Sequence, residues 1–164
     1  MFKSLFKKKE KDFNVTAPLS GRVVSLEEVP DQVFSQKMMG DGVAIIPTNG
    51  QVFSPIEGEI VDVFRTKHAI SMRSKDGAEF LIHMGLETVS LNGDGFDVKV
   101  NNGDKVKKGT PLAEMDIDKI VSAGYKTITP IILLNGDDFS VKSVTESDNV
   151  AGGDSHLLEL EKQG

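Results

Sequence analysis

The sequence of 164 residues contains no cysteine, and aromatic residues make up only 6% of it. Without cysteine, disulfides, thiolate catalysis and cysteine-ligated metal sites are excluded. No apolar run approaches the roughly 20 residues of a membrane-spanning helix, and the N-terminus lacks the continuous apolar stretch of a secretory signal. We therefore expect a soluble, cytoplasmic protein whose chemistry does not depend on thiols.

Negative charge dominates the chain except at its beginning. Residues 1–12 (MFKSLFKKKEKD) hold five lysines beside Glu10 and Asp12, whereas the whole chain has a net charge of −6. The rest of the chain is therefore strongly acidic. An acidic body disfavours nucleic acid as the main partner and favours association with something basic.

The first 14 residues are predicted to form a basic tail ahead of the folded domain. Four apolar residues recur at helical spacing near the start, with lysines beside them. One interpretation is a disordered, solubilising terminus. The other is a short amphipathic helix over residues 1–12 that makes weak, salt-sensitive contact with an anionic membrane surface.

Short β-type segments separated by turn residues begin at Val15, and glycine is abundant, with 16 residues. This pattern predicts a single, mostly antiparallel, all-β domain over residues 15–164. Besides the strands of the repeat described below, strands are expected at residues 43–46, 51–53, 60–65, 67–73, 78–84, 96–100, 111–115, 126–134, 139–144 and 157–161.

Two short helices are expected within this β pattern. Asp116 is a suitable N-cap for a helix with Ile117, Ile120 and Val121 as its apolar stripe, which would end at Gly124. A second helical turn is expected over residues 31–37. The polar segment 145–155 is predicted to be a mobile loop before the last strand.

A ten-residue pattern occurs twice, 37 positions apart, at residues 17–26 (APLSGRVVSL) and 54–63 (SPIEGEIVDV). Both copies have a proline, a glycine three residues later, and then a β-branched pair. We interpret the pattern as a duplicated unit in which a Pro-x-x-Gly turn leads into a strand. Chance similarity between two β-hairpins is the alternative.

Two of the three histidines lie in segments that alternate in polarity. In the first segment Thr66 and His68 share one face of a strand, and in the second His83 and Gly85 share one. His156 lies in a polar C-terminal stretch and is expected to be solvent-exposed.

The connection between these two segments contains Asp76-Gly77, a strong hairpin signal. With a two-residue loop, Ile70 would oppose His83, and the two histidines would become diagonal neighbours on one face of the sheet. A three-residue loop would reverse the parity and separate them, so this inference depends on the turn.

A pair of imidazoles beside a hydroxyl is suited to phosphoryl-group chemistry. A neutral imidazole is a good nucleophile near pH 7, and a second one can donate a hydrogen bond to phosphoryl oxygens. The hydroxyl of Thr66 can fix a tautomer, and Gly85 leaves room for a ligand. Two ordinary half-buried histidines are the alternative. His68 and His83 could also form a partial zinc site completed by a partner, since no third ligand is visible.

Several blocks of residues point together to a known family. LIHMGLETV at residues 81–89 contains His83, and FRTKHAI at residues 64–70 contains His68; further blocks are APLSG (17–21), VPD (29–31), Phe34, GDG (40–42) and TITP (127–130). In this order they resemble the glucose-type enzyme IIA of the bacterial phosphoenolpyruvate-dependent sugar phosphotransferase system, over about residues 15–145.

The resemblance implies an antiparallel β-sandwich, a barrel-like hybrid with an internal duplication. It implies a phosphotransferase component without a cofactor, which acts as a phosphocarrier. His83 would accept a phosphoryl group from the phosphohistidine of the carrier HPr and pass it to a cysteine of a sugar-specific IIB domain of a membrane permease. His68 would stabilise the phosphoryl group, with Thr66 orienting it. Unphosphorylated members of the family can also bind transporters and metabolic enzymes as regulatory targets.

The resemblance further implies an apolar docking face around His83, formed by Phe34, Met39, Phe64, Ile70, Leu81 and Val89. Asp31 and Glu87 would lie at its edge and meet basic groups on partners. Methionines at positions 38 and 39 and Gln32 depart from the family pattern and leave partner preference open.

Two other classes remain as alternatives. Residues 103–112 (GDKVKKGTPL) resemble the hairpin of biotinyl and lipoyl carrier domains, but the tripeptide around the modified lysine of those domains does not follow. A zinc peptidase on a related duplicated β fold would need a His-x-His pair, and none occurs in the sequence.

Overall fold

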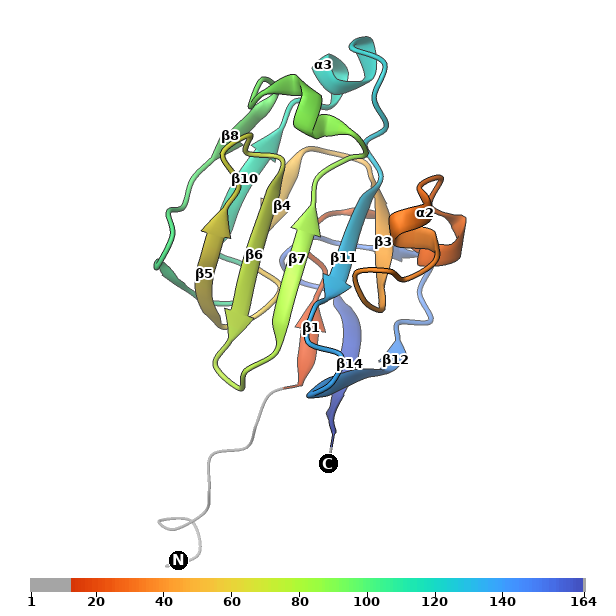
Figure 1. Ribbon diagram of the computed structural model, residues 1–164, viewed down its shortest axis with the longest axis vertical. Helices are drawn as coiled ribbons and strands as arrows, with labels where there is room; N and C mark the ends of the chain where they lie inside the picture. Colours follow the sequence, from red (N-terminus) through yellow and green to blue (C-terminus); the bar gives the residue numbers. More distant parts are fainter. Residues whose placement is uncertain (1–12, 164) are drawn as a thin grey trace, which may run out of the picture.

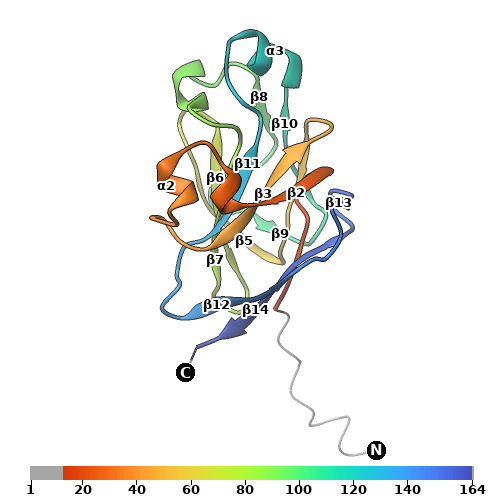
Figure 2. The ribbon, with the colours of Figure 1, turned by 90° about the vertical axis from the view of Figure 1, so that its right-hand side faces the viewer.

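The computed structural model describes residues 13–163, and it consists mostly of β-strands with two short α-helices (Figures 1 and 2). The elements in chain order are β1 (Asn14–Thr16), β2 (Gly21–Ser25), the 3-10 turn η1 (Leu26–Glu28), α2 (Gln32–Ser35), β3 (Gly42–Pro47), β4 (Gln51–Phe53), β5 (Gly58–Val63), β6 (Ala69–Ser74), β7 (Glu79–His83), the 3-10 turn η2 (Thr88–Leu91), β8 (Phe96–Val98), β9 (Lys105–Val106), β10 (Pro111–Met115), α3 (Ile117–Ser122), β11 (Thr129–Leu133), β12 (Phe139–Val144), β13 (Asn149–Val150) and β14 (His156–Lys162).

The strands form one large sheet and two small ones. The large sheet has eight strands in the order β13-β2-β3-β11-β7-β6-β5-β9, and the small sheets have the orders β1-β14-β12 and β4-β10-β8. The pairings between these strands are antiparallel. The main core lies between the large sheet and the small ones, and its fully buried members include Ile70, Met72, Phe80, Ile82 and Ile131 from the former and Leu112, Leu157 and Leu158 from the latter. The predicted antiparallel β-sandwich is therefore confirmed.

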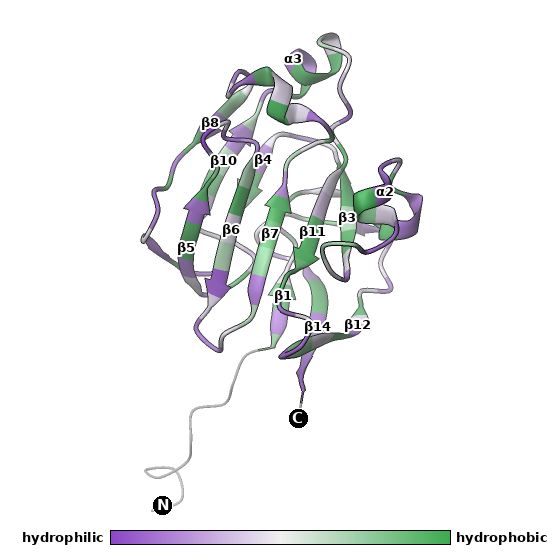
Figure 3. Cartoon of the chain, in the orientation of Figure 1, coloured by the Kyte–Doolittle hydropathy of each residue, from purple (hydrophilic) through white to green (hydrophobic). Residues whose placement is uncertain are grey.

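A second, smaller cluster of buried residues covers part of the other face of the large sheet. Its members are Val24, Leu26, Val29, Phe34, Ala44, Ala69, Leu81, Leu86, Ile128 and Ile132. Strand residues alternate between the two faces, so Leu81 belongs to this outer cluster while Ile82 belongs to the main core. Hydrophobic residues are concentrated along β7 and β11 in the middle of the sheet (Figure 3). The outer face therefore offers an apolar platform beside α2.

The residue that precedes each copy of the repeat donates a hydrogen bond to the proline of the other copy. The Thr16 N–H donates to the Pro55 carbonyl at 2.9 Å, and the Phe53 N–H donates to the Pro18 carbonyl at 2.8 Å. The hairpins β2–β3 and β5–β6 also occupy equivalent places on either side of the central β11–β7 pair. These equivalences confirm the predicted internal duplication.

The glycine of each copy stands where another strand passes very closely. A Cβ atom on Gly21 would lie 2.1 Å from the carbonyl oxygen of Ile46, and one on Gly58 would lie 2.0 Å from that of Arg73. Because a backbone oxygen cannot move aside alone, a side chain at either position would force the two strands apart. This explains why the repeat has glycine in both copies.

The two predicted helices are present. The Asp31 carboxylate caps α2 by accepting from the Val33 N–H at 2.9 Å, and the Asp116 carboxylate caps α3 by accepting from the Lys119 N–H at 3.1 Å. Gly124, with a φ of 92°, follows the end of α3 as expected. The strands predicted at residues 51–53, 111–115 and 139–144 have the observed bounds, and the other predicted strands are found with ends shifted by a few residues.

Segment 145–155 was predicted to be a mobile loop, but it contains the short strand β13, which pairs with β2. Further bonds attach it to the first repeat: the Gly153 N–H donates to the Ala17 carbonyl at 2.8 Å, and the Gly152 N–H donates to the Ser20 hydroxyl at 2.9 Å. The segment thus forms hydrogen bonds with residues that are distant in sequence, and its local composition does not indicate this pairing.

The hairpin between β6 and β7 also differs from its prediction. Ala69 pairs with His83 and Ile70 with Ile82, so the predicted two-residue loop and the pairing of Ile70 with His83 are wrong. The loop has three residues, 75–77, and ends with Gly77 at a φ of 101°, as three-residue hairpin loops commonly do.

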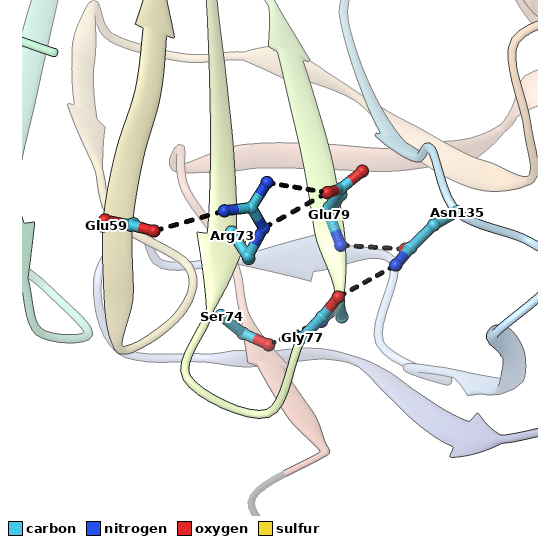
Figure 4. Close-up of polar contacts among 7 residues, drawn as sticks. Glu59, Arg73, Ser74, Gly77, Glu79 and Asn135 are labelled. Carbon is cyan, nitrogen blue, oxygen red and sulfur yellow. Dashed lines mark hydrogen bonds and ion pairs between the residues drawn. The ribbon is translucent and has the colours of Figure 1, made fainter. Parts of the chain in front are cut away.

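Asn135 explains the longer loop. Its side-chain amide donates to the Gly77 carbonyl at 2.9 Å and accepts from the Glu79 N–H at 2.9 Å (Figure 4). The same picture shows Arg73 joining Glu59 of β5 to Glu79 of β7, at 3.3 and 3.0 Å. The register of this hairpin is therefore held from the neighbouring strand β5 and from the loop after β11.

Within residues 13–163, the helices are too short and too polar to cross a membrane. The proposed lipid contact of residues 1–12 lies outside the described residues.

Candidate functional site

His68 and His83 lie together on the outer face of the large sheet. Their ring centroids are 4.9 Å apart, with the ring planes at 80°. His83 is the last residue of β7, and His68 directly precedes β6. The predicted proximity of the pair is confirmed, although the strand register is not the one on which it was predicted.

A tight turn before β6 brings the two rings together. In the observed register Ala69 pairs with His83, so a strand extended backward would place His68 on the opposite face. The chain instead turns at residues 64–68: Lys67 has a φ of 60°, and its N–H donates to the Phe64 carbonyl at 2.8 Å. The prediction that Thr66 and His68 lie in a regularly alternating strand is therefore wrong, and this departure from strand geometry brings the two histidines together.

His83 is held by a backbone carbonyl. Its Nδ1 lies 2.7 Å from the Gly85 carbonyl oxygen. Because a carbonyl can only accept, Nδ1 carries the proton and donates, and Nε2 keeps its lone pair. His83 is half-buried, so this nucleophilic nitrogen belongs to a ring that is shielded on one side and accessible on the other.

His68 is more deeply placed, with only 4% of its surface exposed. Its Nδ1 lies 2.7 Å from Oγ1 of Thr66. Burial, together with the neighbouring His83, lowers the pKa of His68 to about 4, while a hydrogen bond with the backbone of Thr66 opposes the shift. His68 is therefore neutral at pH 7.

Burial also lowers the pKa of His83, and its hydrogen bond with Gly85 and the charge of Asp31 partly oppose this. Both rings are consequently neutral near pH 7. Two neutral imidazoles can take different roles: one offers a nitrogen lone pair as a nucleophile, and the other offers an N–H group as a hydrogen-bond donor.

Two phenylalanines flank the pair. The Phe34 ring lies 5.0 Å from that of His83, and the Phe64 ring lies 5.6 Å from that of His68, edge to face. Phe34 is only 4% exposed, whereas Phe64 is 36% exposed. Phe34 therefore belongs to the platform beneath His83, and Phe64 contributes to the accessible rim.

The predicted docking face is only partly accessible. Met39, Phe64 and Val89 are exposed, as a face for partners requires. Ile70 is fully buried in the main core, so its assignment to this face is wrong. Leu81 is buried in the outer cluster beside Phe34. The reason is the register: the observed pairing directs Ile70 inward, opposite Ile82.

Sequence reasoning missed two residues near the site. Val33 of α2 is 41% exposed next to Phe34, and its place in a capped helical turn was the available signal. Thr88 is fully buried and donates from Oγ1 to the Met84 carbonyl at 2.6 Å. No local pattern marks a threonine for such a bond.

Acidic residues lie beside the pair, as expected. Asp31 is close enough to His83 to influence its protonation, and Glu87 is exposed just before η2. Both line a hollow of about 140 Å³ together with Tyr125 and Lys126. The edge of the site thus presents carboxylates to an approaching basic group.

His156 is exposed and begins β14, where it pairs with Thr16, as predicted for a residue without a role in this site. Among residues 13–163, no cluster of three or more histidine, aspartate or glutamate side chains is arranged to hold a metal ion. His68 and His83 supply two ligands, half of a tetrahedral zinc site.

Comparison with known proteins gives concordant matches. Residues 13–139 match the family model described as the phosphoenolpyruvate-dependent sugar phosphotransferase system, EIIA 1. A glucose-specific EIIA component of this system from Oceanobacillus iheyensis is 48% identical over 98% of this chain and 99% of its own length. One from Staphylococcus epidermidis is 42% identical over 98% of each chain. The solved structure of glucose permease IIA from Mycoplasma capricolum superposes with a TM-score of 0.84 at 36% identity, over 92% of this chain and 96% of the other.

Proposed function

The chain belongs to the EIIA 1 family of the phosphoenolpyruvate-dependent sugar phosphotransferase system, and we propose that it carries a phosphoryl group on Nε2 of His83. The observation that supports this most directly is the bond from Nδ1 of His83 to the Gly85 carbonyl at 2.7 Å. That bond leaves Nε2 as the nucleophilic nitrogen beside a second, neutral imidazole.

In the proposed acceptance step, the Nε2 lone pair attacks the phosphorus atom of a phosphohistidine on HPr. The new N–P bond forms as the donor N–P bond breaks, and the donor ring recovers its electron pair. The ring of His83, now substituted at both nitrogens, gains positive charge. The Gly85 carbonyl and the carboxylate of Asp31 stabilise that charge, and they are also the groups that oppose the lowering of the pKa of His83.

His68 has a different proposed task. If the Thr66 hydroxyl donates to Nδ1 of His68, the ring carries its proton on Nε2 and can donate it to a phosphoryl oxygen. Phosphoryl transfer depends mainly on positioning and charge stabilisation. His68 therefore holds the phosphoryl group while a thiolate of a IIB domain attacks the phosphorus and the bond to His83 breaks.

The surface around the histidines suits short-lived contact with successive partners. Met39, Phe64 and Val89 form an exposed apolar rim, and a docked partner would expel water from the N–P bond. Asp31 and Glu87 would attract basic groups and raise the encounter rate more than the affinity. The same face can serve HPr, the IIB domain and any regulatory target in turn. The basic segment 1–12 is proposed to add weak contact with a membrane surface.

Incubation with phosphoenolpyruvate, enzyme I and HPr should add one acid-labile phosphate to each chain. His83→Gln should abolish this labelling, because an amide cannot replace the nucleophilic nitrogen. His68→Gln should still accept phosphate, because an amide can donate a hydrogen bond to the phosphoryl group. Transfer from His68→Gln to a IIB domain should nevertheless be slow, since the amide cannot change its protonation as charge moves.

Thr66→Ala should show a milder transfer defect, and His156→Gln, which changes an exposed histidine outside the site, should match the unmodified protein. Normal labelling of His83→Gln, with the phosphate on His68, would reverse the assigned roles. No labelling of the unmodified protein would contradict the proposed function as a whole.

A further inference from the structure

Thr88 is a fully buried polar residue that the phosphoryl transfer described above leaves without a role. Its hydroxyl donates to the carbonyl of Met84 at 2.6 Å. Met84 lies between His83 and Gly85, and its own N–H donates to the carbonyl of His68 at 2.7 Å. Thr88 therefore binds the backbone of Met84, which is adjacent to His83 in the chain and hydrogen-bonded to the backbone of His68.

The peptide groups on both sides of Gly85 are held in place. The preceding group contains the Met84 carbonyl, which Thr88 binds. The following group contains the Gly85 carbonyl together with the Leu86 N–H, which donates to the Lys126 carbonyl at 3.0 Å. Because each peptide group is planar and rigid, these two anchors determine the direction of the Gly85 carbonyl. That direction decides whether the carbonyl meets Nδ1 of His83.

The turn has little room to adjust. Gly85 has a φ of 81°, in the left-handed region, and a Cβ atom there would lie 2.7 Å from both Cγ2 of Thr88 and the carbonyl oxygen of Lys126. Thr88 thus contacts the turn through its hydroxyl and packs its methyl group closely against Gly85.

We propose that Thr88 is a positioning residue that keeps His83 in the tautomer with Nδ1 protonated and Nε2 free. It does so by fixing the Met84 carbonyl and, through it, the Gly85 carbonyl. In the opposite tautomer the proton would occupy Nε2 and block the attack on phosphorus. The catalytic consequence rests on the proposed function, whereas the tautomer is a property of the unphosphorylated protein.

The test replaces the hydroxyl by a methyl group in Thr88→Val. Nitrogen-15 NMR of the histidine rings should show Nδ1-protonated His83 in the unmodified protein and a mixture of tautomers in Thr88→Val. The rate of labelling by phosphorylated HPr should fall by about tenfold, because small displacements of a reacting group have effects of this order or larger. Thr88→Ser, which keeps the hydroxyl, should restore the tautomer and keep the rate within about twofold.

Thr129→Val is a matched control. Thr129 is also fully buried, and its hydroxyl donates to the backbone carbonyl of Thr127 at 2.9 Å. It should lose stability to a similar extent as Thr88→Val but leave the tautomer of His83 unchanged. If Thr88→Val does not fold, Thr88→Ser and Thr88→Ala, which differ only in the hydroxyl, provide the same comparison.

An unchanged His83 tautomer in Thr88→Val, or a tautomer shift of equal size in Thr129→Val, would overturn the positioning role. Loss of the Nδ1-protonated form in Thr88→Ser would also overturn it, because the hydroxyl is retained there. If the unmodified protein takes no phosphate, the proposed function fails, but the tautomer comparison still decides the role of Thr88.

Discussion

At the scale of single residues, the site depends on keeping two histidines uncharged at physiological pH. Only 4% of the His68 surface is exposed, and its neighbour is another imidazole that would repel a second positive charge. The arrangement therefore disfavours protonation in the folded state. An unfolded chain has no such restriction, and its histidines titrate near the ordinary value of about 6.5.

This difference makes the stability of the protein depend on pH. Between pH 6.5 and about 4, the pKa of folded His68, the unfolded state binds more protons, so the free energy of unfolding falls as the pH is lowered. Between pH 7.5 and 5.5 the contribution of His68 to this loss should be about 1 kcal/mol. Denaturant titrations of the unmodified protein and of His68→Gln should show the smaller loss in the variant.

His156→Gln is the control for this experiment, since it removes an exposed histidine and should retain the loss seen in the unmodified protein. An equal loss of stability in His68→Gln and in the unmodified protein would mean that His68 titrates as in the unfolded chain. Its burial beside His83 would then have no energetic effect.

At the scale of elements, the hydrophobic residues of α2 and η2 have two different roles: one supports the ring of His83 from within the protein, and the other is exposed for contact with partners. Phe34 of α2 packs under the ring of His83 and is 4% exposed, whereas Val89 of η2 is 48% exposed. Both were expected on one docking face. The structure gives them different tasks, because the capped turn of α2 directs Phe34 toward the sheet and Val33 away from it.

A charge introduced at each position should separate these tasks. Val89→Asp should keep its stability within about 0.5 kcal/mol, as exposed substitutions usually do, while transfer to and from both partners slows. Phe34→Asp should lose about 3 kcal/mol or more, because it removes a buried ring and buries a carboxylate. Thermal unfolding and labelling rates measured on both variants test this. A stable Phe34→Asp protein would place that ring on the surface.

At the scale of the whole molecule, two copies of one unit surround the central strand pair and exchange hydrogen bonds. Each copy begins its hairpin at a glycine that leaves no room for a side chain, with Cβ distances of 2.1 and 2.0 Å to the facing carbonyl oxygens. If the copies contribute equally to the sandwich, equivalent damage to each should have equivalent effects.

Gly21→Ala and Gly58→Ala should therefore lower the free energy of unfolding by similar amounts, about 1 to 3 kcal/mol each, because the backbones must move apart. Gly136→Ala is the matched control. Gly136 has open space around its Cα and should change stability by less than about 1 kcal/mol. Denaturant midpoints measure all three, and a neutral effect at either repeat glycine would show that the strands there separate easily.

Much of this molecule followed from the sequence, and the reason is that the signals are local. The aspartate caps of α2 and α3, the Pro-x-x-Gly turns and the short alternating strands each depend on residues within a few positions of one another. The histidine segments could also be recognised as a pair, because their residue types and order are those of the EIIA family.

The register of the β6–β7 hairpin could not be predicted in the same way. Asp76-Gly77 favours a two-residue loop locally, but Asn135, 58 positions from Gly77, holds a three-residue one. Because this longer loop shifts the strand register by one residue, Ile70 lies in the core and not on the face of His83. The turn at Lys67 then returned His68 to the face of His83, so the expected pair arose from a different backbone path.

The available chemistry and the strands and helices that carry it could be predicted from the sequence, since local backbone preferences and short-range hydrogen bonds set both. The face that each residue occupies, the histidine nitrogen that is free and the aromatic ring that is buried were set by tertiary packing. These depend on carbonyls and side chains contributed by distant segments, such as Asn135 at the loop and Lys126 at the Gly85 turn. These contacts form only once the strands have paired, so no local sequence pattern can predict them.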